Sequence, residues 1–126
     1  MWNYNRWPNF RPHELLSLAG RAMLERGVFL LDVNAVDKLQ KLRSILDAPV
    51  LCNYQGMVFR GYRSSEENAA INGAAPFSFH LQGKAFDVSC PRVPLEQLEK
   101  AAIDAGFSYS YRISEQSLHV DTRFLG

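Results

Sequence analysis

The segment from residue 78 to residue 87, Ser-Phe-His-Leu-Gln-Gly-Lys-Ala-Phe-Asp, constrains the fold of this chain more than any other. Residues 84–89 alternate in character, and this two-residue period predicts a strand with Ala85 and Asp87 on one face. Residues 118–121, Leu-His-Val-Asp, repeat the alternation and place His119 and Asp121 on one face of a second strand. We therefore expect a sheet in which these polar faces converge.

His80, Asp87 and His119 are a candidate ligand set for one zinc ion. Two neutral imidazoles and one carboxylate hold Zn²⁺ and leave a fourth position for water. The site keeps a positive net charge, so a bound water can ionise near neutral pH and attack a carbonyl. Nitrogen and oxygen ligands favour zinc but also admit other divalent ions. Asp121 is expected either to orient a ligand or to pair with a surface cation.

The remaining periodicity predicts an α+β domain with a small, mainly antiparallel sheet and helices packed on one side. Helices are expected over residues 12–26, from a cap at Asn34 to residue 46, from Ser64 or Ser65 to residue 70, and over residues 94–105. Their buried stripes are expected to include Ile45 and Ile103. Further strands are expected over residues 50–52, 107–113 and 118–124, the last two as a hairpin.

The 126 residues suit a single domain, 1–126, in which residues 1–12 form an aromatic N-terminal arm. Packing of this arm onto the domain is favoured over a carbohydrate-stacking surface made by Trp2 and Trp7. A net charge of +1 argues against nucleic acid or an anionic membrane as a partner. No signal peptide and no apolar run long enough to span a bilayer are expected. Cys52 and Cys90 are expected to be buried thiols, with a disulfide as the alternative.

These residues resemble the zinc peptidases of the M15 family, the D-Ala-D-Ala carboxypeptidase and L-Ala-D-Glu endopeptidase group. The shared pattern is Ser-x-His, then Gly-x-Ala-x-Asp, then His-x-Asp, and it falls on Ser78, His80, Gly83, Ala85, Asp87, His119 and Asp121. The block Gly61-Tyr62-Arg63-Ser64 also resembles the family. The segment from Phe10 to Leu15 resembles a small branch found in bacteria and their phages.

The resemblance implies a Zn²⁺-dependent peptidase domain that hydrolyses an amide bond in peptidoglycan stem peptides or crosslinks, with its zinc site in a groove on the sheet face away from the helices. It implies that Arg63 binds the substrate carboxylate or the developing oxyanion, a role suited to a planar, permanently charged guanidinium. Ser78 is expected to be a hydrogen-bonding group for the substrate or for a ligand, because no base is placed to make it a nucleophile. We expect a monomer in the host or bacterial cytoplasm that reaches the cell wall after release, as a phage lysis enzyme does, or as a virion component.

The general base is the point at which the chain departs from the family. Well-studied members carry Asp or Glu three residues before the last histidine, where this chain has Gln116. Glu115 is the favoured substitute because strand parity would place it on the face of His119, and an external or absent base is the alternative. Gln116 also leaves open a non-catalytic zinc domain that binds cell wall or a protein partner. The sequence leaves open which bond is cut.

Overall fold

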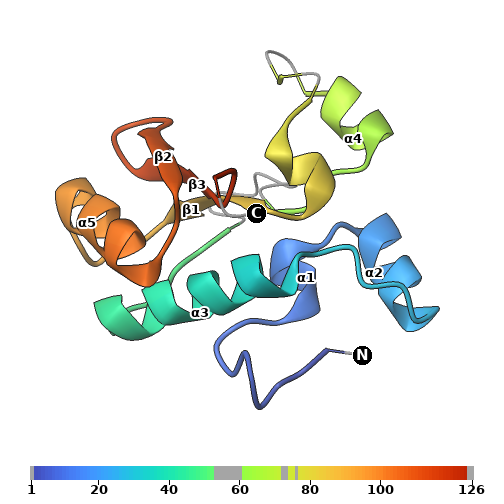
Figure 1. Cartoon of the computed structure of the whole chain (residues 1–126), viewed down its shortest axis with the longest axis horizontal. Helices are drawn as coiled ribbons and strands as arrows, with labels where there is room; N and C mark the ends of the chain where they lie inside the picture. The colour runs from blue at the N-terminus through green and yellow to red at the C-terminus, as the bar shows by residue number, and fades with distance from the viewer. Residues whose placement is uncertain (1, 53–60, 72–73, 76, 125–126) are drawn as a thin grey trace.

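The computed structural model describes residues 2–52, 61–71, 74–75 and 77–124. Five α-helices, one 3₁₀ helix and three strands follow in order along these residues (Figure 1). They are α1 (Pro12–Leu15), α2 (Leu18–Glu25), α3 (Val33–Leu46), α4 (Ser65–Ala69), η2 (Phe79–Gln82), β1 (Ala85–Ser89), α5 (Leu95–Ala105), β2 (Tyr109–Arg112) and β3 (Ser117–Asp121). No helix in these ranges is long and apolar enough to cross a membrane. The sequence Gly73-Ala74-Ala75-Pro76 is typical of a turn, but residues 73 and 76 lie outside the described residues, as does Arg60, for which we expect a structural role.

The three strands form one antiparallel sheet in the order β1-β3-β2, so the α+β class is confirmed. β3 is the central strand, and β2 and β3 form the predicted hairpin. The expected strand at residues 50–52 is reduced to a single bridge between Leu51 and Ser89. The alternation along the strands separates a core face from a polar face, as the sequence predicted. The core face carries four fully buried side chains, those of Phe86, Val88, Leu118 and Val120.

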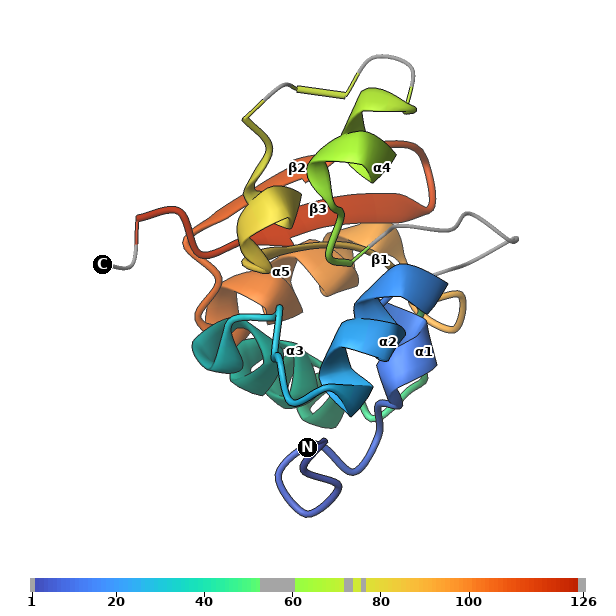
Figure 2. The same ribbon diagram turned by 90° about the vertical axis from the view of Figure 1, so that its right-hand side faces the viewer.

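Helices α3 and α5 cover the core face of the sheet, whereas α4 lies on the opposite side (Figure 2). The C-cap residues of α3 and α5, Asp47 and Gly106, both adopt the left-handed conformation. Ile45 is 43% exposed and Ile103 is 67% exposed, so their predicted burial is wrong. In α5 the buried residues recur at 98, 101, 102 and 105, which turns position 103 toward solvent.

The predicted helix over residues 12–26 is two helices joined at Leu16 and Ser17. Leu16 is extended, with φ −127° and ψ 139°, and the Ser17 hydroxyl accepts a hydrogen bond from the Gly20 amide. Ser17 is thus the N-cap of a new helix, the role that serine favours over a helix interior. The predicted cap at Asn34 is also wrong, because α3 begins at Val33 and Asp32 is its N-cap residue.

The N-terminal arm packs against α3, as expected. Trp2 and Trp7 are 5% and 3% exposed, which leaves their rings no open face for carbohydrate stacking. The Trp7 indole donates to Asp37 at 2.9 Å, and Arg6 binds the same carboxylate through two bonds of 2.6 Å. Cys52 and Cys90 are buried as thiols.

Candidate metal centre

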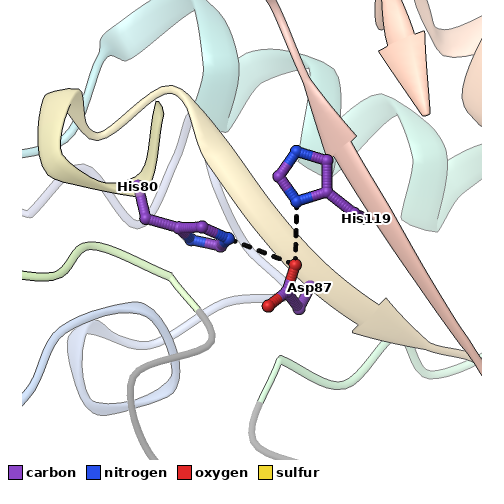
Figure 3. A group of neighbouring side chains, drawn as sticks. All are labelled: His80, Asp87 and His119. Atoms are coloured by element: carbon purple, nitrogen blue, oxygen red, sulfur yellow. Dashed lines mark hydrogen bonds and ion pairs between the residues drawn. The ribbon is translucent and has the colours of Figure 1, made fainter. Parts of the chain in front are cut away.

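Asp87 and His119 converge because they are direct Cα partners in the β1–β3 register. His80 approaches the same carboxylate from η2, the turn that precedes β1 (Figure 3). Oδ1 of Asp87 lies 3.1 Å from Nε2 of His80 and 3.0 Å from Nδ1 of His119. One ligand atom from each of the three residues lies within 4.8 Å of the others, so the group could hold a single metal ion.

Local sequence features of η2 place His80. Ser78 is the N-cap residue, and its hydroxyl accepts a hydrogen bond from the His80 amide at 3.2 Å. Gly83 ends the turn with φ +67°. A Cβ at Gly83 would collide with the Leu30 carbonyl oxygen and lie 2.6 Å from the Leu31 Cα, so only glycine allows the backbone to approach this closely.

The outward nitrogen of each imidazole is held by an acceptor. Nδ1 of His80 lies 2.7 Å from the Gly61 carbonyl oxygen, and Nε2 of His119 lies 2.7 Å from Oδ2 of Asp121. Because a carbonyl and a carboxylate can only accept, each outward nitrogen carries the proton. In the neutral rings the inward nitrogens therefore present lone pairs to the centre, as metal ligation requires. The donor set fits a divalent cation.

The backbone of Gly61 can lie against the backbone of Leu15 because glycine has no side chain. A Cβ there would collide with the carbonyl oxygen of Leu15, and the next amide, that of Tyr62, donates to the same oxygen at 3.1 Å. The Arg63 amide donates to the His80 carbonyl at 3.2 Å. Residues 61–63 are thus held between the end of α1 and η2, which aims the Gly61 carbonyl at His80.

Arg63 contacts the candidate ligand set directly. Its Nη2 donates to Oδ2 of Asp87 at 3.0 Å, and its Nη1 donates to Oδ1 of Asn68 at 3.3 Å. Asn68 is buried in α4, and this helix begins with a capping box between Ser64 and Glu67, as the sequence indicated for Ser64. The Gly61–Ser64 block therefore positions an arginine beside the carboxylate that both histidines face.

The charges of the site depend on one another. Burial opposes ionisation of Asp87, but hydrogen bonds from His119 and His80 outweigh burial and hold its pKa well below the usual range. Burial likewise opposes the charged form of His119, but hydrogen bonds to Asp121 and Asp87 raise its pKa overall. Asp121 is buried as well, yet hydrogen bonds from His119 and Arg123 lower its pKa to about 2. Without a metal, this arrangement favours a proton between His119 and Asp87.

Glu115 does not lie on the strand that was expected to carry it. β3 begins at Ser117, so Glu115 and Gln116 lie in the exposed loop between β2 and β3, and strand parity does not apply to them. Both residues line a pocket of about 370 Å³ with Pro91, Val93 and Leu98. Glu115 is not among the three residues whose ligand atoms converge.

Sequence reasoning missed two side chains beside the centre. Tyr111 is the β2 partner of His119, and its ring stacks on the imidazole with centroids 4.6 Å apart. Arg123 binds Asp121, the carboxylate behind His119. The two-residue period would have placed Tyr111 on the polar face, but only the strand order makes it the neighbour of His119.

Two imidazoles and one carboxylate, brought together here by an antiparallel sheet in an α+β domain, are a ligand set typical of single-metal hydrolases. The family model described as Peptidase M15 matches residues 8–121. The chain therefore belongs to the M15 family of peptidases, which are metallopeptidases. None of the curated proteins compared with the chain matches it.

Proposed function

We propose that the protein is a zinc-dependent peptidase that hydrolyses an amide bond in peptidoglycan stem peptides or crosslinks, as a D,D-carboxypeptidase or an endopeptidase. The observation that carries the proposal is the convergence of His80, Asp87 and His119 in a chain of the M15 family. The peptidoglycan substrate and the choice of zinc follow from family membership and from the ligand set.

In this proposal His80 Nε2, Asp87 and His119 Nδ1 hold the ion. A zinc ion held by these residues would supply the Lewis acidity that amide hydrolysis near neutral pH requires. The Gly61 carbonyl and Asp121 keep both imidazoles in the required tautomer through their bonds of 2.7 Å.

Arg63 is the proposed partner of the substrate carboxylate or of the developing oxyanion. Its side chain is 11% exposed and carries its charge beside Oδ2 of Asp87, so a group that reaches the centre also comes close to the guanidinium. Because its bond to Asp87 also orients a proposed ligand, Arg63 serves two tasks at once. Ser78 caps η2, and a hydrogen bond from Ser78 to the substrate is a further proposal.

Glu115 remains the proposed proton shuttle. The two carboxylates at the centre, Asp87 and Asp121, both lie within hydrogen-bonding distance of imidazoles, which leaves neither ready to take a proton from water. Glu115 is the one carboxylate in the loop that leads into the strand of His119. A base supplied by the substrate or by solvent is the alternative.

We propose that the enzyme acts as a monomer and reaches the cell wall after release from the cytoplasm, as a phage lysis enzyme does, or as a virion component. The peptidoglycan peptide is then its only proposed macromolecular partner. The net charge of +1 is in keeping with the absence of nucleic acid from this scheme.

The test pairs a metal analysis with a cleavage assay. Purified protein is loaded with zinc, zinc content is measured, and release of free amines from purified cell wall is followed with and without a chelator. We expect zinc-dependent release, and we expect Asp87→Asn to lose both zinc and activity while Asp104→Asn, at an exposed ion pair on α5, keeps both. Equal release by the metal-free protein would overturn the proposal.

A non-catalytic zinc domain that binds cell wall is the second candidate. The observation in its favour is Gln116, which stands where relatives carry a proton-transferring side chain and lies in an exposed loop. Retention of zinc and binding to cell wall, without release of amines, would support this candidate over the first.

A further inference from the structure

Arg123 lies just beyond β3 and binds Asp121, the carboxylate that also contacts His119. Its Nη2 donates to Oδ2 of Asp121 at 2.6 Å, and its Nε lies 3.0 Å from both carboxylate oxygens. The Arg123 amide donates to Oδ1 at 3.0 Å. Asp121 itself is completely buried. A buried carboxylate is costly unless it is paired and hydrogen-bonded, and Arg123 supplies both the charge and the donors.

The guanidinium of Arg123 also contacts two aromatic rings. Its central carbon lies 3.7 Å from the Tyr109 ring centroid and 4.7 Å from the Phe79 ring centroid. Tyr109 is the β2 partner of Asp121, and Phe79 precedes His80 in η2. Stacking against two rings restricts the rotamers of a long side chain and adds cation–π attraction.

One side chain therefore joins the two segments that supply the candidate imidazoles. It reaches His119 through the Asp121 carboxylate, and it reaches the turn of His80 through the Phe79 ring. Oδ2 of Asp121 receives Nη2 of Arg123 and the Nε2–H of His119, so the guanidinium fixes the direction in which this oxygen points.

We propose that Arg123 is a positioning residue for the metal centre, which sets the zinc affinity by holding Asp121 against His119 and η2 against the sheet. The inference rests on the proposed function, because it requires that His80, Asp87 and His119 bind zinc. Groups that orient metal-bound imidazoles from behind typically change metal affinity by about 10- to 100-fold when they are removed.

The experiment measures zinc affinity at one fixed pH by competition with a chromogenic chelator. The parent is compared with Arg123→Ala, Arg123→Lys and Arg112→Ala. Arg112 is the matched control, since it is an exposed arginine of the same sheet with a 2.7 Å bond to Glu99. We expect about 10- to 100-fold weaker binding for Arg123→Ala, a smaller loss for Arg123→Lys, and no change for Arg112→Ala.

A double-mutant cycle with Asp121→Asn separates positioning from a general contribution to folding. If Arg123 acts through Asp121, Arg123→Ala should weaken zinc binding much less in the Asp121→Asn background than in the parent. Full additivity of the two losses, or parent-like affinity in a folded Arg123→Ala protein, would overturn the inference. Should Arg123→Ala fail to fold by near-ultraviolet circular dichroism, Arg123→Lys decides, and parent-like affinity in that variant overturns the inference.

The same titration distinguishes this inference from the proposed function. A parent protein that binds no zinc overturns both. A parent that binds zinc, with an Arg123→Ala variant that binds it equally well, overturns only the role of Arg123.

Discussion

Oδ1 of Asp87 lies 3.0 Å from Nδ1 of His119 across a pair of strands whose register makes the two residues direct Cα partners. The backbone hydrogen bonds of β1 and β3 therefore fix the separation of two proposed ligands before any ion is bound. With Asp121 accepting from Nε2, a neutral His119 turns a bare lone pair toward the carboxylate. Only a proton or a cation between them makes that contact favourable.

The stability of the metal-free protein and the stabilisation added by zinc should change with pH in opposite directions. The raised pKa of His119, which follows from its hydrogen bonds to Asp121 and Asp87 despite burial, stabilises the metal-free fold fully below its ordinary value of 6.5. This stabilisation is lost as pH rises through the folded-state value. The lowered pKa values of Asp87 and Asp121 contribute stability above their ordinary value of 3.8 that is lost only in stronger acid.

The metal-free protein should therefore resist urea best between these two ordinary values, at about pH 5, and less well at about pH 8.5. Zinc should stabilise more as pH rises, because the proton that competes with the ion then leaves His119. Urea midpoints measured at both pH values, with chelator and with zinc, check both trends. A metal-free midpoint that is higher at pH 8.5, or zinc stabilisation that is greater at pH 5, would contradict this account.

Arg63→Lys should separate the two tasks assigned to Arg63. Lysine keeps the positive charge but loses the planar fork that spans Asp87 and Asn68. We expect zinc affinity to fall by no more than about 10-fold. We expect kcat on a cell-wall peptide to fall by about 100-fold at saturating zinc, the loss typical of removing an oxyanion donor.

The matched control for Arg63 is Arg6→Lys, because Arg6 also grips one carboxylate through two bonds but lies on the N-terminal arm. If activity of Arg63→Lys returns to the parent level once zinc is saturating, the substrate role is wrong and only the bond to Asp87 remains.

Gly61→Ala should reduce both stability and zinc affinity. The added methyl group would collide with the Leu15 carbonyl oxygen and displace the carbonyl that holds Nδ1 of His80. Overpacking of this kind costs about 1–3 kcal/mol, and a displaced imidazole should bind zinc about 10-fold more weakly. Urea titration and chelator competition measure the two effects.

Gly27→Ala is the control for Gly61. Gly27 has φ +86° and nothing within 4 Å of an added Cβ, so this variant should lose about 1 kcal/mol from backbone strain with no change in zinc affinity. Equal zinc affinities in the parent and Gly61→Ala would show that the Gly61 carbonyl does not position His80.

Glu115→Gln tests the proton shuttle. Removal of a general base typically costs about 100- to 10,000-fold in rate, and zinc content should stay at the parent level because Glu115 is not among the converging residues. Glu96→Gln, at an exposed position of the first turn of α5, should leave the rate unchanged. A fully active Glu115→Gln enzyme would remove Glu115 from the mechanism and leave the peptidase assignment intact.

The sequence predicted the parts of the site that depend on short-range patterns. The two-residue period placed Asp87 and His119 on the polar faces of their strands. The expected placement of Glu115 relied on strand alternation before residue 117, but β3 begins at Ser117, and the hairpin sets that strand end. Arg123 was missed because its partners, Phe79 and Tyr109, come from separate segments that only the tertiary fold brings together.

The helix predictions failed for a related reason. Hydrophobic spacing over residues 12–26 is equally compatible with one helix or two, and the Ser17 hydroxyl decides between them by capping the second helix. Whether Ile45 and Ile103 are buried depends on which faces of α3 and α5 contact each other. The sequence offers more apolar positions than that contact can cover.

The backbone segments that carry the two imidazoles differ in how firmly they are held by hydrogen bonds. His119 belongs to a strand that is paired along both edges, whereas His80 belongs to a four-residue turn held by its Ser78 cap and by contacts with its neighbours. Withdrawal of the ion should loosen the turn before the strand, and amide hydrogen exchange should quicken first around residues 79–82. Ion binding would then begin at Asp87 and His119, whose strands are already paired, and His80 would join the ligand set last.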